Sequence, residues 1–167
     1  MVDETPKTWV LTCSPENYAA TRAHAHGVIG VKERNRNRAL RIAVGDRIVL
    51  YLTRVSSFAA SIVVTGELFE QRTVLWPGRT GRADIYPWRF ATRPEIVVPE
   101  QEWVPAETLA DTLDHVAKWP REHWTLAFQG QLRTVSEHDT GVLLARLRAA
   151  AGAPAAADAR LGAGMRA

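Results

Sequence analysis

Short apolar runs rich in β-branched residues dominate the first hundred positions and predict β-strands. Five such runs are present, at 8–13, 27–31, 47–53, 58–69 and 88–98. From Ile48 to Leu52 the chain is apolar without interruption, so we expect that strand to be covered on both faces. The runs 47–53 and 58–69 are close in sequence and predict a hairpin. Gly66 predicts a bulge, and Pro94 predicts an edge position or a break in the last strand.

Helical patterns follow the first strand and return in the second half of the chain. Ser14 is a typical N-cap residue and Pro15 suits the first helical position, which predicts a helix that ends near Ala23. Segments 105–116 and 136–150 carry apolar residues at helical spacing, the second with Ser136 as its N-cap. The inward positions we expect are Leu109, Leu113, Val116, Val142, Leu143, Leu144 and Leu147.

These elements predict a single α+β domain, namely a small open barrel of five or six mixed strands closed by short helices. The chain has 167 residues, which suits one domain with a proper core. Residues 151–167 are mostly Ala and Gly and contain no aromatic residue. Such a segment buries too little apolar surface to offset the entropy of ordering. We therefore expect a domain over 1–150 and a disordered tail over 151–167.

Cysteine usage and hydropathy indicate a cytoplasmic protein. Cys13 is the single cysteine, and no Cys or His spacing resembles a zinc site. No apolar run approaches the roughly 18 residues of a membrane span, and residues 1–8 lack the apolar core of a signal peptide. We expect no metal, no cofactor and no membrane partner.

Positive charge is concentrated in one segment although the formal net charge is only +3. Residues 32–47 place six basic side chains against the carboxylates of Glu33 and Asp46. The basic residues are Lys32, Arg34, Arg36, Arg38, Arg41 and Arg47. Such a run is compatible with a solvated loop or with an arm that faces phosphate groups.

The aromatic residues suggest a binding site more than the nucleophiles do. The chain contains no Gly-x-Ser-x-Gly elbow, no His-Glu-x-x-His helix and no phosphate loop. Trp76 ends a strand before a segment rich in Gly and Pro, where an indole either fills the core or stands over a cleft. A flat base needs an aromatic wall, polar groups at its edge and cations for its phosphates. Trp76, the amide of Asn17 and the basic segment 32–41 supply these three elements.

Several short motifs, taken in order, resemble a known family. They are Trp9, Ser14-Pro15-Glu16-Asn17-Tyr18, Gly30-Val31-Lys32, Gly45-Asp46, Val64-Thr65-Gly66-Glu67, Tyr86-Pro87-Trp88-Arg89 and Gly130 to Asp139. Together they cover roughly residues 7–148 and resemble the EVE domain of the PUA-like superfamily, of the UPF0310 type, which is related to the YTH domains that bind methylated RNA. The resemblance implies a PUA-like pseudo-barrel with a pocket for a modified base of DNA or RNA, and no catalysis.

The same resemblance implies roles for individual positions. Cys13, Ser14 and Asn17 would make polar contacts, Gly30 would allow close backbone approach, and Trp76 would stack on the base. The phosphate contacts would come from Lys32, Arg34, Arg36, Arg38 and Arg133. Ile29 stands where relatives often carry a Trp, so the pocket would be only partly aromatic. Losing one such wall removes stacking of about 1–3 kcal/mol.

Two other function classes stay open. An enzyme that acts on a nucleotide or RNA substrate would need a residue of perturbed pKa in the cleft, for which Cys13, His24 and His26 are the candidates. A protein-interaction domain would need an exposed apolar patch.

Overall fold

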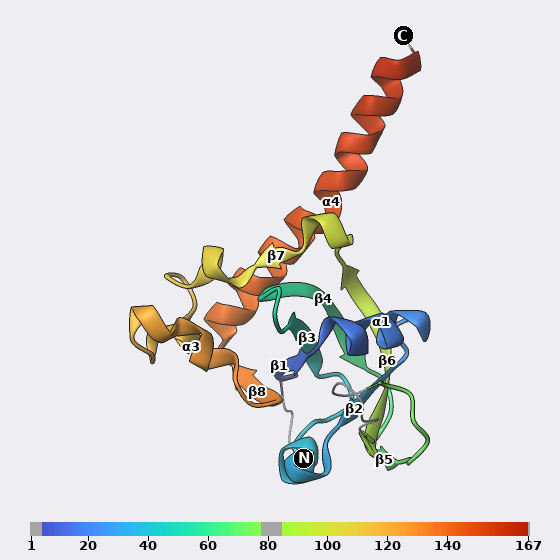
Figure 1. Cartoon of the computed structure of the whole chain (residues 1–167), viewed down its shortest axis with the longest axis vertical. Coiled ribbons are helices and arrows are strands. Elements are labelled where there is room, and N and C mark those ends of the chain that lie inside the picture. The colour runs from blue at the N-terminus through green and yellow to red at the C-terminus, as the bar shows by residue number, and fades with distance from the viewer. Residues whose placement is uncertain (1–4, 78–84, 167) are drawn as a thin grey trace.

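A computed structural model describes residues 5–77 and 85–166, with side chains up to Gly152; the predicted loop 78–81 lies outside the described residues. Six strands form a curled sheet in the order β2-β6-β4-β3-β1-β8 (Figure 1). Their bounds are β1 Thr8–Cys13, β2 Val28–Val31, β3 Arg47–Leu52, β4 Ser57–Val64, β6 Trp88–Val97 and β8 Leu132–Val135. Two short strands lie off this path: β5, Phe69–Glu70, pairs with β6, and β7, Val104–Pro105, pairs with β4.

The sheet is mixed, which confirms the predicted α+β pseudo-barrel. The β1–β3 pair is parallel, and the other strand pairs are antiparallel. The predicted hairpin is the antiparallel β3–β4 pair. Strand β3 lies between β4 and β1 in the interior of the sheet. Ile48–Leu52 is apolar throughout because both faces are covered: Val49 and Tyr51 belong to one buried apolar cluster, and Ile48, Leu50 and Leu52 belong to the other.

The hydrogen bonds around Gly66 have the two-to-one pattern of the predicted bulge, just beyond the end of β4 at Val64. The N–H groups of Thr65 and Gly66 both donate to Ala91 O, at 2.9 and 3.3 Å. The register shifts lie between Leu50 and Tyr51 in β3 and between Ser61 and Ile62 in β4. Pro94 does not break β6. It pairs with Ile62 in the half of β6 that is bound to β4, whereas β2 pairs only with the other half.

Helix α1, Pro15–Ala23, begins as its sequence predicts. Ser14 has extended backbone angles, and its Oγ accepts a hydrogen bond from Asn17 N at 3.1 Å. This cap satisfies one of the free N–H groups of the first turn. The cap therefore fixes the first turn of α1, and with it Asn17, directly after β1.

The single helix predicted over 105–116 is wrong, because the chain forms two short ones. They are η3, Ala106–Leu109, and α3, Asp114–Ala117, and Leu113 between them has extended backbone angles (ψ 127°). The buried carboxylate of Asp139 accepts hydrogen bonds from Asp114 N at 2.7 Å and from His115 N at 2.8 Å. This long-range cap starts a new helix where the local pattern predicts continuation. The expected apolar positions Leu109, Leu113 and Val116 are nevertheless buried.

Helix α4, Glu137–Arg166, starts after Ser136, whose Oγ accepts from Asp139 N at 3.1 Å as expected. Its inner face buries Leu143, Leu144 and Leu147. The structure continues the helical backbone through the segment predicted as a disordered tail. The division into a domain over 1–150 and a disordered tail over 151–167 stays a prediction.

Further short helices complete the described chain. They are η1 Glu33–Asn35, α2 Arg36–Ala39, η2 Glu100–Glu102 and η4 Arg121–Phe128. Two clusters of buried apolar side chains form. One joins the sheet to α4, α3 and η4 and includes Tyr51, Phe58 and Phe128. The other joins the sheet to α1 and α2 and includes Tyr18 and Ile29.

Candidate functional site

A cavity of about 1050 Å³ opens at the end of β1, beside α1 and β2. All the predicted ligand contacts line it, and so do two of the predicted phosphate contacts; these are Cys13, Ser14, Asn17, Ile29, Gly30 and Trp76, with Lys32 and Arg34. Strand β1 and the capped start of α1 carry the first three of these residues, and β2 carries the next two. The cavity lies at the upper end of the range for small-molecule sites. It has room for more than a single base.

A buried polar pair in the cavity lining joins α1 to the segment before β6. Asn17 Nδ2 donates to the hydroxyl oxygen of Tyr86 at 2.8 Å, and each residue is 7% exposed. The sequence offers Asn17 as an edge contact because an amide carries both donors and an acceptor. The structure adds Tyr86 to the cavity lining. In the sequence, Tyr86 is only part of the motif Tyr86-Pro87-Trp88-Arg89.

Trp76 is a buried wall of the cavity and does not overhang it. Its ring is 4% exposed, and its Nε1 donates to Thr21 Oγ1 at 2.9 Å. The ring packs on Gly30, where an added Cβ would come within 2.6 Å of both Trp76 Cζ3 and Tyr86 Cβ. Glycine at position 30 is therefore what lets the indole lie against β2. Trp76 therefore does both things that the sequence left open: most of its surface is buried in the domain, and the rest lines the cavity.

A buried cation stands behind this wall. Arg89 is fully buried, and its guanidinium lies 5.1 Å from the centre of the Trp76 ring. It donates to Tyr86 O at 2.9 Å, to Gln71 Oε1 at 2.8 Å and to Thr73. Burial lowers the pKa of Arg89. Among the described residues its partners are neutral oxygens and the indole face, which offset part of its desolvation, and no described carboxylate forms an ion pair with it.

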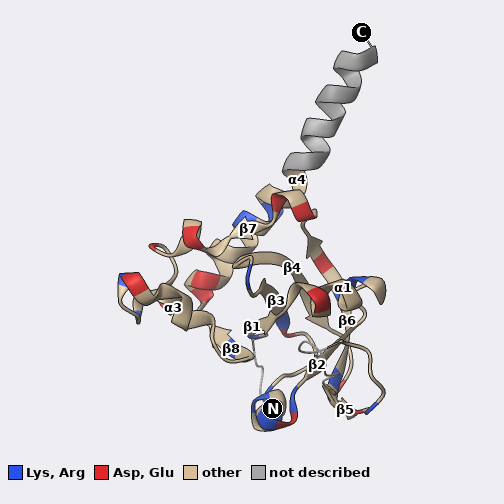
Figure 2. Ribbon diagram, in the orientation of Figure 1, with Lys and Arg blue, Asp and Glu red and all other residues tan. Residues whose placement is uncertain are grey.

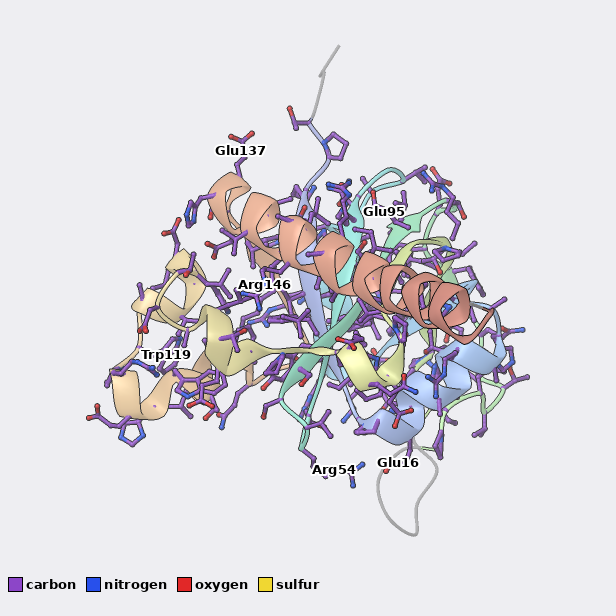
Figure 3. The ribbon with its side chains drawn as sticks, turned by 90° about the horizontal axis from the view of Figure 1, so that it is seen from above. Glu16, Arg54, Glu95, Trp119, Glu137 and Arg146 are labelled. Atoms are coloured by element: carbon purple, nitrogen blue, oxygen red, sulfur yellow. The ribbon has the colours of Figure 1, made fainter. Side chains whose placement is uncertain are left out.

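Charged side chains gather at the mouth of the cavity. Lys32 is half-buried, with its Nζ 5.7 Å from the centre of the Tyr86 ring, and Arg34 is exposed. Glu16 from α1 and Arg54 from the turn after β3 form an exposed ion pair, which Figure 3 shows at the edge of the molecule. The hydrogen bond from Arg54 lowers the pKa of Glu16. Arg54 is a cavity cation that sequence analysis missed.

The other predicted phosphate contacts lie outside the cavity lining. The guanidinium of Arg36 covers the ring of Trp88 at 4.8 Å, and Arg38 Nη1 donates to Leu132 O at 2.9 Å. Arg133 Nε donates to Gln129 O at 3.1 Å. Figure 2 shows basic residues on the short helical segment after β2, close to β8. These cations can only meet a strand that continues beyond the cavity.

Gln131 is a lining residue that the sequence does not reveal. It is 8% exposed, and its Oε1 accepts from Lys32 N at 2.9 Å and from Asn35 Nδ2 at 3.1 Å. It therefore ties the segment before β8 to the end of β2. The one local signal is Gly130, whose φ of +85° marks a turn that favours glycine.

The candidate nucleophile and bases do not form a catalytic set among the described residues. Burial raises the pKa of Cys13 to about 12, so its thiol is neutral and a poor nucleophile at neutral pH. His26 is bonded to the Tyr18 hydroxyl at 2.9 Å, and His24 is exposed; neither lines the cavity.

One possible metal-binding cluster lies away from the cavity, at Asp114, His138 and Asp139. Both oxygens of Asp139 already accept backbone N–H groups at the start of α3, which makes this a helix cap.

Among the described helices, none is both long enough and apolar enough to cross a membrane.

Comparison with known proteins finds likeness in structure and none in sequence. No family model and no curated protein matches. The YTH domain of Zygosaccharomyces rouxii MRB1 protein, solved in complex with N6-methyladenosine RNA, superposes with a TM-score of 0.61 at 14% identity, over 88% of this chain and 90% of that one. The chain has the fold of a YTH domain.

Two further solved structures share this fold. A hypothetical protein from Leishmania major has a TM-score of 0.60 at 12% identity, over 88% of this chain and 98% of that one. A protein from Pseudomonas putida has a TM-score of 0.54 at 13% identity, over 84% and 99%. Identities this low support the common fold, which agrees with the PUA-like architecture. The narrower assignment to EVE domains of the UPF0310 type stays a prediction.

Proposed function

We propose that this protein is a non-catalytic binding module for a modified nucleobase in a nucleic acid strand. The observation that carries the proposal is the cavity beside α1, which brings together the six side chains and backbone positions expected to contact the base. Chain segments that contribute to it are far apart in sequence, from β1 to the turn before β8. A YTH fold solved with N6-methyladenosine RNA adds support by analogy.

In this proposal polar contacts recognise the base and apolar walls enclose it. Asn17 presents an amide to the base edge from the rigid start of α1. Trp76 and Tyr86 offer limited ring surface, since they are 4% and 7% exposed, and Ile29 supplies an aliphatic wall in place of an aromatic one. Recognition therefore depends on hydrogen bonds at the base edge more than on stacking.

The cations outside the base pocket provide the sequence-independent part of binding. Lys32 and Arg34 line the cavity and would meet the phosphates next to the bound base. Arg36, Arg38 and Arg133 lie beyond it and would meet phosphates farther along the strand. Each cation that neutralises a phosphate releases counterions, so affinity falls as salt rises.

The experiment is a fluorescence titration with short RNA and DNA strands that differ by one modified base. We expect tighter binding to a strand with a modified adenine or cytosine than to its unmodified counterpart. The difference should persist as the salt concentration is raised, while both affinities fall. Equal, salt-sensitive binding to modified and unmodified strands would contradict the proposal. The RNA and DNA arms show which strand is the better ligand.

Asn17→Ala is the variant of choice, because it removes the proposed base-edge amide with a smaller loss of packed volume than a substitution of Trp76; thermal unfolding is checked in parallel, since Asn17 is buried and bonded to Tyr86. Removing a base-edge amide should weaken binding to the modified strand by about tenfold, in line with a buried hydrogen bond. Asn37→Ala is the matched control. Asn37 is exposed on α2 and does not line the cavity. The affinity of the Asn37→Ala variant for the modified strand should therefore stay within about twofold of the parent protein's.

A further inference from the structure

We propose that the cavity accepts a neutral modified base and rejects one that carries a fixed positive charge. The inference rests on the proposed function and specifies its ligand class. It starts from the two aromatic walls, because each already has a cation from the protein on its ring. The guanidinium of Arg89 lies 5.1 Å from the centre of the Trp76 ring, and Nζ of Lys32 lies 5.7 Å from the centre of the Tyr86 ring.

Sites that hold cationic ligands work in the opposite way. They present open aromatic faces, whose electron density attracts the cation. Here Trp76 is 4% exposed and Tyr86 is 7% exposed. A cationic base that entered would lose its hydration and would find little free aromatic surface in return.

The charges around the cavity oppose a cation as well. Among the described lining residues, Lys32, Arg34 and Arg54 are cationic, and the carboxylate of Glu16 is bound to Arg54. Fully buried Arg89 adds another positive charge behind the Trp76 wall. Repulsion between like charges is strongest where water is excluded. Phosphate groups at the mouth are attracted by the same charges, so the strand is favoured while a cationic base is not.

Pairs of isomers isolate the effect of charge. We would compare RNA strands that carry N6-methyladenosine or 1-methyladenosine, and strands that carry 5-methylcytidine or 3-methylcytidine. The two members of each pair are the same base with one methyl group at different positions. At neutral pH only the second member of each pair is a cation. The inference predicts at least tenfold weaker binding of the cationic isomer in the pair whose neutral member binds, equivalent to about 1.4 kcal/mol.

Variants separate charge from the position of the methyl group. Lys32→Met removes the cation from the Tyr86 ring and should reduce the ratio of the two affinities at least threefold. Arg36→Met is the matched control, since it removes a cation from the ring of Trp88, which does not line the cavity. It should lower both affinities and leave their ratio unchanged. Arg89→Met should reduce the ratio as well, with thermal unfolding checked in parallel because Arg89 is fully buried.

The outcomes distinguish this inference from the proposed function. Equal or tighter binding of the cationic isomer overturns the inference and leaves base recognition intact. Equal reduction of the ratio by Lys32→Met and Arg36→Met also overturns it, since the discrimination would then come from the general surface charge. If strands with neutral modified bases bind no better than unmodified ones, the proposed function fails and this inference fails with it.

Discussion

The two faces of the sheet are built in different ways. Under α4, the core is filled by aliphatic side chains and by the stacked pair of Tyr51 and Phe128, whose ring centres lie 4.5 Å apart. On the side of α1, large buried residues such as Arg89 and Trp76 are held by hydrogen bonds, and a cavity remains beside them. Both faces carry a cluster of packed apolar side chains, but the α1 side also borders the cavity, which Phe128 of the other cluster lines from across the sheet.

The difference shows how a small domain keeps a cavity open. Apolar side chains adapt their packing to fill space, but a hydrogen bond holds a polar side chain at a set distance and direction. Every buried side-chain nitrogen and oxygen atom among the described residues has a hydrogen-bond partner. The walls around the cavity can therefore be rigid without being close-packed toward its centre.

The largest effect is expected in the packed apolar core under α4. Leu147→Ala in α4 removes a side chain that is 1% exposed and should lower the free energy of unfolding by about 2–5 kcal/mol. Urea denaturation measures the loss. Leu40→Ala is the control, because Leu40 is 54% exposed and should change stability by less than about 0.5 kcal/mol. A small effect at Leu147 would contradict the view that this face is held by packing.

A smaller effect is expected at the cavity wall. Gly30→Ala places a Cβ within 2.6 Å of Trp76 and Tyr86, so the wall must shift, which should lower the free energy of unfolding by about 1–3 kcal/mol. Ligand binding should weaken as well. Gly141→Ala is the matched control: it lies within α4 with no atom within 4 Å of the added Cβ, and should stabilise the protein by up to about 1 kcal/mol. An unchanged free energy of unfolding for Gly30→Ala would contradict this prediction and would indicate that Trp76 and Tyr86 can move aside at little cost.

The smallest effect concerns pH and the start of α4. The hydrogen bond to Asp139 and the nearby charge of Asp114 raise the pKa of His138 above its usual 6.5. A raised folded-state pKa adds stability that is fully present below the unfolded-state value and is lost as the pH rises through the folded-state value. His138→Gln should therefore reduce stability slightly below pH 6.5, and the difference should disappear as the pH rises through the raised folded-state pKa. Denaturation at several pH values measures this, with exposed His123→Gln as the control.

Local sequence was enough to predict most of the strands and the start of α1. Strand β1 and helix α1 have the expected bounds, because a β-branched run and a Ser-Pro cap act within a few residues. The split between η3 and α3 was not predictable in this way. It depends on Asp139, more than twenty positions later, whose carboxylate binds the N–H groups of Asp114 and His115.

The cavity residues divide along the same line. Asn17 and Gly30 belong to short motifs and were candidates from the sequence. Gln131 and Arg54 were missed, because only the folded chain brings the segment before β8 and the turn after β3 to the mouth of the cavity. The predicted phosphate contacts that lie outside the cavity lining are Arg36, Arg38 and Arg133. Their place relative to the cavity was not predictable, because the sequence does not show in which direction a long side chain extends.

The sequence by itself determined the strands, the capped helix starts, the basic segment and the presence of Gly30, because each depends on forces between near neighbours. Only the tertiary structure decided that Trp76 is a buried wall, that Arg89 lies over its ring and that Asn17 meets Tyr86. Burial and hydrogen bonding between distant segments set these positions. The chemical character of the cavity therefore follows from the fold of the whole domain.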